Sequence, residues 1–215
     1  MLSIDEVVDR YDRQNLIEGW DQSVLDQSRL AIVGTDIAAH FAGLAATALG
    51  FGTIEIYGQG RVENAGFLFY QAEQGTQKAV ALAAQLDRMN PLNEIHGLDI
   101  GFSYPGNTAV LGEPNAIIVA QNNPVQTYAI MEYGVQHSIP VITLATNDTY
   151  GAMGYQRNRM ARHKRENLFF TEVEGDQGIE TSQIMAAIAV EEARRAVMML
   201  PGEQHLSQID RKSVV

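Results

Sequence analysis

Short apolar segments alternate with longer amphipathic ones along most of the chain. The apolar, β-branched runs predict strands at residues 30–33, 53–57, 94–98, 116–120 and 140–145. Apolar residues at helical spacing predict helices over 37–49, 75–89, 125–137 and 183–200. Strands that alternate with helices favour an α/β fold, Rossmann-like and doubly wound, with a mainly parallel sheet and helices on both faces. Any ligand crevice should then lie at the carboxyl ends of the strands.

The first strand, turn and helix have the arrangement of a nucleotide-binding βαβ unit. Such a unit normally carries G-x-G-x-x-G, so that backbone N–H groups and the helix N-terminus can approach phosphate. Here the turn reads GTDIAA from Gly34, which keeps only the first glycine and places Asp36 where an anion would bind. Asp36 suits helix capping better than phosphate binding. These residues alone therefore favour a structural turn over a working phosphate loop.

The pattern divides the chain into three parts. Residues 1–28 predict a helical N-terminal preface, docked as a surface helix through apolar residues such as Leu16 and Trp20. Residues 29–200 predict a single Rossmann-like domain, and residues 201–215 a polar tail. A chain of 215 residues is long enough to bury a substantial core within one such domain.

Composition narrows the function further. A net charge of −11 disfavours nucleic acid and anionic membranes as partners. The absence of cysteine excludes disulfides, thiolate zinc sites and cysteine-thioester chemistry on this chain, and we expect no metal site of its own. The polar N-terminus and the lack of a long apolar run lead us to expect a cytoplasmic protein.

Five of the fifteen Lys and Arg residues fall between positions 157 and 165. A local basic patch on an acidic protein can bind a carboxylate, a phosphate or an acidic partner. The candidates for substrate or partner binding are Arg157, Arg159, Arg162 and Arg165. A solvated crossover segment or an ion-pairing face would explain the same residues.

Eight short motifs occur in an order and spacing that resemble the ThiF/MoeB/HesA family of adenylyltransferases. They are RYDRQ (10–14), SRLAIVG (28–34), ALGFGTIEI (48–56), RVEN (61–64), GTQKA (75–79), LDRMNP (86–91), NNP (122–124) and IPVI (139–142). The resemblance implies a dimeric α/β protein that holds MgATP at the strand ends, where a carboxylate attacks the α-phosphate.

Residue by residue, the resemblance implies a degenerate adenylation site. The polar residues that the family uses for ribose, phosphate, Mg²⁺ and nearby contacts fall on Gly58, Gly60, Gly66, Phe69, Tyr70, Asn122 and Thr127. Two positions survive. Lys78 matches the lysine that reaches the ATP phosphates, and Arg13 matches the arginine that one protomer inserts into its partner's site. A surface ion pair with Asp9 or Asp12 would explain Arg13 equally well.

Three hypotheses follow. The first is a non-catalytic dimer partner or scaffold, paired with itself or with an active paralogue and holding a carrier protein or peptide. The second is a divergent adenylyltransferase that needs ATP and Mg²⁺, with Gly34, Asp36, Lys78 and Asn122 as nucleotide-binding candidates and Arg13 acting in trans. The third is a small-molecule-binding protein that uses the aromatic residues Phe67, Phe69 and Tyr70 to line the old nucleotide pocket.

Overall fold

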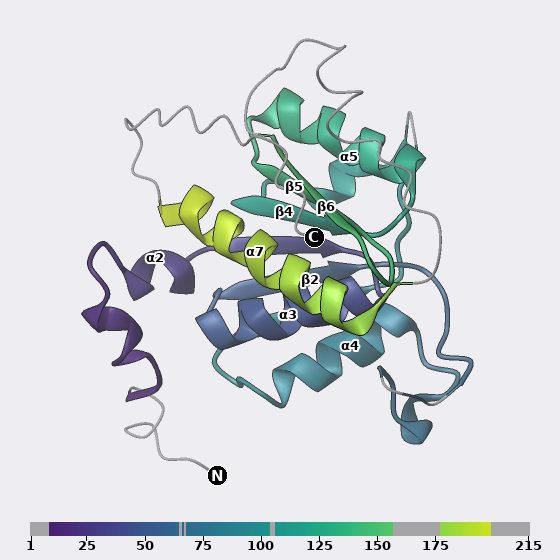
Figure 1. The fold of residues 1–215 in the computed structure, drawn as a ribbon, viewed down its shortest axis with the longest axis horizontal. Helices are drawn as coiled ribbons and strands as arrows, with labels where there is room; N and C mark the ends of the chain where they lie inside the picture. The colour runs from purple at the N-terminus through teal and green to yellow at the C-terminus, as the bar shows by residue number, and fades with distance from the viewer. Residues whose placement is uncertain (1–8, 65, 67, 104–105, 157–176, 199–215) are drawn as a thin grey trace.

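Six strands form one sheet in the order β3-β2-β1-β4-β5-β6 (Figure 1). The computed structural model describes residues 9–64, 66, 68–103, 106–156 and 177–198. The strands are β1 (Arg29–Val33), β2 (Thr53–Tyr57), β3 (Glu94–Leu98), β4 (Ala116–Ala120), β5 (Val141–Thr146) and β6 (Gly151–Gln156). Strands β1 to β5 pair in parallel and β6 pairs antiparallel with β5, so the predicted mainly parallel sheet is confirmed.

Helices cover both faces of the sheet, as predicted. They are α2 (Gln22–Asp26), α3 (Ile37–Leu49), α4 (Lys78–Asp87), α5 (Pro124–His137) and α7 (Ile179–Met198), with short 3-10 turns η1 (Asp9–Tyr11), η2 (Gln14–Leu16), η3 (Gln71–Glu73) and η4 (Thr108–Leu111). Side chains that alternate along β1 point to opposite faces, as they must in a strand. Leu30 and Ile32 pack with α3, α4 and α7, whereas Ala31 and Val33 pack with α5 and the η4 segment.

The edge strand β6 was not predicted from the sequence. Its residues GAMGYQ include two glycines, which weaken both β propensity and the alternating pattern. Gly151 has a packing reason, because a Cβ atom there would lie 2.4 Å from Cγ of Met185 on α7. Gly151 thus weakens the strand pattern in the sequence, and it also lets α7 approach the end of the sheet.

The N-terminal segment is less helical than expected, and of the two residues expected to dock it, Trp20 packs against the core and Leu16 does not. Tyr11 is buried, and its hydroxyl accepts a hydrogen bond of 2.7 Å from the side chain of Asn90. Trp20 is half-buried, with the guanidinium of Arg194 4.9 Å above its ring. Leu16, by contrast, is 86% exposed, so the expectation that it docks this segment was wrong.

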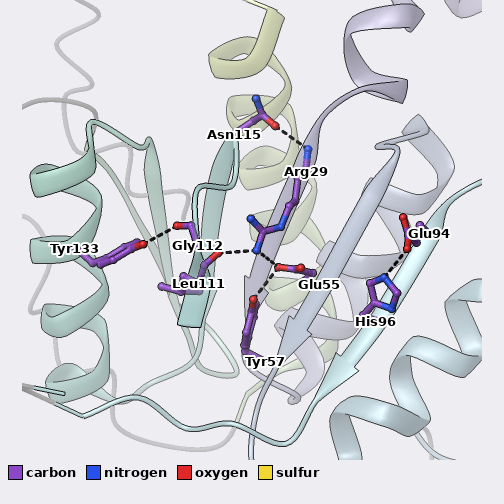
Figure 2. A network of polar contacts seen from close by, with 9 residues as sticks. All are labelled: Arg29, Glu55, Tyr57, Glu94, His96, Leu111, Gly112, Asn115 and Tyr133. Atoms are coloured by element: carbon purple, nitrogen blue, oxygen red, sulfur yellow. Dashed lines mark hydrogen bonds and ion pairs between the residues drawn. The ribbon is translucent and has the colours of Figure 1, made fainter. Parts of the chain in front are cut away.

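A polar network on the α5 side joins the interior strands β1 and β2 to the segment before β4 (Figure 2). Arg29 forms an ion pair of 2.6 Å with Glu55 and donates a hydrogen bond of 2.7 Å to the carbonyl oxygen of Leu111. Tyr57 donates to the same Glu55 carboxylate. These contacts hold the η4 segment against β1 and β2, and they engage Glu55 on this side of the sheet.

The described residues include no helix that is long and apolar enough to cross a membrane.

Candidate functional site

A cavity of about 270 Å³ opens at the carboxyl end of β1, where the fold class predicts a ligand crevice. Its walls come from the start of α3, the segment after β2 and the first turn of α4. The lining residues are Thr35, Asp36, Val62, Glu63, Asn64, Gly66, Leu68, Phe69 and Lys78. The structure therefore brings Asp36 and Lys78 together at one cavity, whereas Gly34 and Asn122 do not line it.

Gly34 is required by the packing of two strand ends. Its φ is +133°, and a Cβ atom there would lie 2.3 Å from the carbonyl oxygen of Ala120. Its N–H donates a hydrogen bond of 2.8 Å to the carbonyl oxygen of Tyr57. Because this N–H is already bonded, Gly34 serves the close approach of β1 to β4 and offers no free donor to an anion.

The N-terminus of α3 receives an oxygen atom from the chain itself. Asp36 occupies the N-cap position, but its side chain makes no capping hydrogen bond. The amide oxygen of Gln177 instead accepts from the N–H of Ala38, at 3.1 Å. Sequence reasoning expected the Asp36 carboxylate to cap this helix, so that expectation was wrong. A phosphate oxygen at a helix N-terminus would use N–H groups of this kind.

The residues that follow Gln177 are fixed across the ends of β4 and β5. A Cβ atom on Gly178 would lie 2.7 Å from Cα of Asp148, so glycine permits close contact with the loop after β5. One turn later, Ser182 and Thr146 share a buried hydrogen bond of 2.9 Å between their hydroxyl groups. The position of Gln177 above α3 is therefore set by the packing of α7.

Asn122 ties the same two strands together. Its side-chain NH₂ donates to the carbonyl oxygen of Thr146 at 3.0 Å, and its Oδ1 accepts from the Thr146 N–H at 3.3 Å. An ionised carboxylate at this position could make only the second of these bonds, because it has no donor. Asn122 thus has a structural role in the described part of the chain.

Gly58 stands where the resemblance implies a ribose-binding carboxylate. A Cβ atom there would lie 2.6 Å from Cγ2 of Thr35. The side chain of Thr35, in the turn after β1, therefore already fills the space that a side chain at position 58 would need. Gly58 itself offers no carboxylate to a ribose.

Lys78 begins α4, and its backbone N–H bonds to the carbonyl oxygen of Gly60 at 2.9 Å. Within the described ranges, its ammonium group forms no ion pair, although two carboxylates, Asp36 and Glu63, line the same cavity. Three charged groups of both signs thus surround the cavity without pairing with each other.

A buried histidine supports the apolar wall of the cavity. His40, on α3, is 5% exposed, and its ring meets Phe69 edge-on with centroids 4.8 Å apart. Nδ1 lies 3.1 Å from the carbonyl oxygen of Asp36, which can only accept, so Nδ1 carries the proton. Nε2 is buried and has no hydrogen-bond partner among the described residues. Burial lowers the pKa of His40, and the carbonyls of Asp36 and Leu68 oppose that shift.

The remaining predicted site residues lie elsewhere. Arg13 is exposed in the N-terminal segment and takes no part in the ion pairs between described residues. Tyr70 is 66% exposed and does not line the cavity, whereas Phe69 does. Phe67, Arg157, Arg159, Arg162 and Arg165 lie outside the described residues. Among those described, no three His, Asp or Glu side chains are grouped to hold a metal ion.

The sheet order and the position of the cavity define a Rossmann-like, doubly wound α/β protein. A model of the ThiF family matches residues 11–197, and the chain belongs to this family. The family resemblance inferred from the short motifs is thereby confirmed. A search of curated proteins gave no match.

Solved structures share this fold. Escherichia coli MccB with succinimide superposes with a TM-score of 0.71 at 14% identity, covering 88% of this chain and 63% of that one. MccB with ATP gives 0.70 at 14% identity, covering 88% and 64%. PaaA gives 0.70 at 21% identity, covering 100% and 83%. The chain thus spans less than two thirds of the MccB chains, and identities this low show the fold alone.

The residues at the cavity do not fit MgATP. Two backbone N–H groups near the turn after β1 are already bonded, that of Ala38 to Gln177 and that of Gly34 to Tyr57. Asp36 adds negative charge beside the helix N-terminus. The side-chain amide of Asn122 is bonded to Thr146. Two carboxylates and one ammonium line the cavity. A polyphosphate carries several negative charges, and among the described residues Lys78 is the one cation at the cavity that could offset them.

Proposed function

We propose that the protein is a non-catalytic member of the ThiF family that acts as a dimer partner or scaffold in a system that modifies a peptide or a carrier protein. The observation that carries the proposal is the hydrogen bond from the Ala38 N–H to Gln177, beside the carboxylate of Asp36. Together these groups occupy the helix end where a nucleotide-binding relative would receive phosphate.

The electrostatics of the cavity support this proposal. Adenylyl transfer builds negative charge on the leaving pyrophosphate, and preorganised cations must offset it. Among the described residues, Lys78 is the one cation that lines the cavity with Asp36 and Glu63. Each lost electrostatic contact costs on the order of 10²–10³ in rate, so several losses together leave little catalysis.

The position of the N-terminal segment supports a role for Arg13 in trans. Tyr11, two residues before Arg13, packs beside Gly50 at the C-terminal end of α3. The cavity lies at the other end of this 13-residue helix, about 20 Å away. Arg13 of one protomer therefore sits far from its own cavity, and we propose that it reaches the site of a partner.

The modification system is proposed from the structural neighbours. MccB has been solved with the peptide MccA, so at least one protein of this fold works on a peptide. A peptide or carrier-protein tail is accordingly the partner class that we propose for this chain.

Two measurements test the proposal. ATP–pyrophosphate exchange by the purified protein should not exceed background. Sedimentation equilibrium should give about twice the monomer mass of 23.6 kDa. Exchange above background would contradict the non-catalytic role, and a monomer at all concentrations would contradict self-association.

A divergent adenylyltransferase is the second candidate, favoured by the place of Lys78 in the cavity wall. It predicts exchange that is lost in Lys78→Ala and retained in Arg88→Ala, which removes an exposed cation that does not line the cavity.

A further inference from the structure

The cavity presents opposite charges that remain unpaired. Lys78 approaches from α4, Asp36 from the start of α3 and Glu63 from the segment after β2. Between the described residues, no hydrogen bond or ion pair involves any of these three charged groups. Asp36 and Glu63 are exposed and Lys78 is half-buried, and the three side chains line the same concave cavity from three separate elements.

An apolar surface completes the wall. Val62 and Phe69 are buried, and Leu68 is half-buried, so these side chains are fixed in place. The edge contact between His40 and Phe69 holds the aromatic ring from behind. The main-chain hydrogen bonds that join Val62 to Thr76 and Gly75, at 2.9 and 2.8 Å, fix the segment after β2. This wall is thus formed before any ligand arrives.

Charge and size limit what the cavity accepts. A volume of about 270 Å³ lies below the range of roughly 300–1,000 Å³ that is common for pockets of drug-sized ligands, so the ligand is small. A simple anion would meet two carboxylates, and the Ala38 N–H that could attract it is bonded to Gln177. A simple cation would leave the Lys78 ammonium unpaired beside it. A molecule with both charges satisfies both sides.

We propose that this cavity binds an α-amino acid with an apolar side chain of medium size. Its carboxylate would pair with Lys78, its ammonium with Asp36 and Glu63, and its side chain would pack on the wall formed by Val62, Leu68 and Phe69. The inference rests on the proposed function, because it gives the cavity a ligand other than MgATP. The protein would thus report or hold a free amino acid at the site that a catalytic relative uses for nucleotide.

The test is calorimetric titration of the full chain with L-leucine, L-methionine and L-phenylalanine. Each is compared with its decarboxylated amine and its deaminated acid, which keep the side chain and remove one charge. We expect at least one amino acid to bind, and each of its two analogues to bind about tenfold more weakly, the effect of losing one charge-assisted contact. Absence of binding by all three amino acids overturns the inference, as does an amine or acid that binds as tightly as its parent.

Two variants test whether the amino acid binds at this cavity. Lys78→Met should weaken binding of the amino acid about tenfold without weakening its amine analogue, whereas Asp36→Asn with Glu63→Gln should weaken the amino acid without weakening the acid analogue. Unchanged affinity in both variants would overturn the inference. Circular dichroism checks that the variants fold, and the analogue series on the wild type needs no variant.

Failure of the amino-acid proposal can be distinguished from failure of the proposed function. MgATP is titrated into the same preparation. Heat with MgATP contradicts the proposed function whatever the amino acids do. Absence of amino-acid binding in a protein that also ignores MgATP overturns the present inference alone.

Discussion

The side-chain oxygen of Gln177 accepts a hydrogen bond of 3.1 Å from the backbone N–H of Ala38, which lies 139 positions earlier in the chain. This contact connects the residues just before α7 with the first turn of α3. A helix N-terminus attracts negatively charged oxygen, and here an uncharged amide from the same chain takes part of that role. The protein thereby satisfies with its own side chain an N–H group of the kind that a helix N-terminus can offer to phosphate.

Replacing Gln177 by alanine tests whether this contact stabilises the fold. The variant leaves the Ala38 N–H without its acceptor, so we expect a loss of about 0.5–2 kcal/mol, the usual cost of removing a capping side chain. For a chain of this length, that corresponds to a decrease in Tm of about 1–8 °C.

Gln183→Ala is the matched control, because Gln183 is exposed on α7. Its Tm should stay within about 1 °C of the wild type, as expected for an exposed substitution. Equal Tm values for the two variants would show that the Gln177 contact has no energetic importance.

Gly34→Ala should be strongly destabilising. The new Cβ would collide with the carbonyl oxygen of Ala120 at a positive φ, which L-residues rarely adopt. We expect a loss of more than about 2 kcal/mol in urea denaturation. Gly66→Ala, where a Cβ would meet nothing within 4 Å, should be tolerated. If Gly34→Ala were as stable as Gly66→Ala, the account of this turn as a packing device would be wrong.

The Arg29 network predicts a second contrast in stability. Arg29→Met keeps the aliphatic stem but removes the ion pair with Glu55 and the bond to Leu111, so we expect a loss of about 1–3 kcal/mol. Arg88→Met breaks a pair of 3.5 Å with Glu73 in which the arginine is 61% exposed, and it should cost at most about 0.5 kcal/mol. Chemical denaturation of both variants measures the difference. A larger loss for Arg88→Met would contradict the structural role given to Arg29.

His40 predicts a dependence of stability on pH. Its pKa is lowered in the folded protein because burial disfavours the charged ring, so the unfolded chain binds its proton more readily. The contribution of neutral His40 is therefore complete above the unfolded pKa of about 6.5 and declines as the pH falls below it. We expect a slope of up to about 1.4 kcal/mol per pH unit between pH 6 and pH 5.

The non-titrating variant His40→Gln isolates this contribution. Urea denaturation at pH 5, 6 and 7.5 should give a smaller decrease for the variant than for the wild type. His96→Gln is the control, since His96 is exposed on β3. The interpretation fails if His40→Gln and the wild type lose the same free energy of unfolding on acidification.

Local patterns were sufficient to predict much of the fold. The run Leu30–Val33, with Gly34 and the small residues of α3, predicted the first βαβ unit, and β2 to β5 follow from similar apolar runs. These predictions depend only on periodicity along the chain. Strand β6 has no such signal, because it contains two glycines, and one of them, Gly151, serves a contact with Met185 of α7 that is distant in sequence.

The candidate site was predicted only in part. Asp36 and Lys78 were assigned to one site, and both line the cavity. Gln177 was missed because a single polar residue in a loop carries no local sign that it will bond to a helix 139 positions away. His40 was missed for a related reason. Its burial depends on Phe69, which reaches it from another part of the chain.

Calorimetric titration of MgATP into the purified protein is the most direct test of the proposal that its cavity does not bind nucleotide. We predict no heat beyond dilution up to millimolar MgATP, in a protein that is folded by circular dichroism, with E. coli MccB as the positive control because its structure has been solved with ATP. Binding in the micromolar range that is abolished by Lys78→Ala would contradict the account, because it would show that this cavity still holds nucleotide.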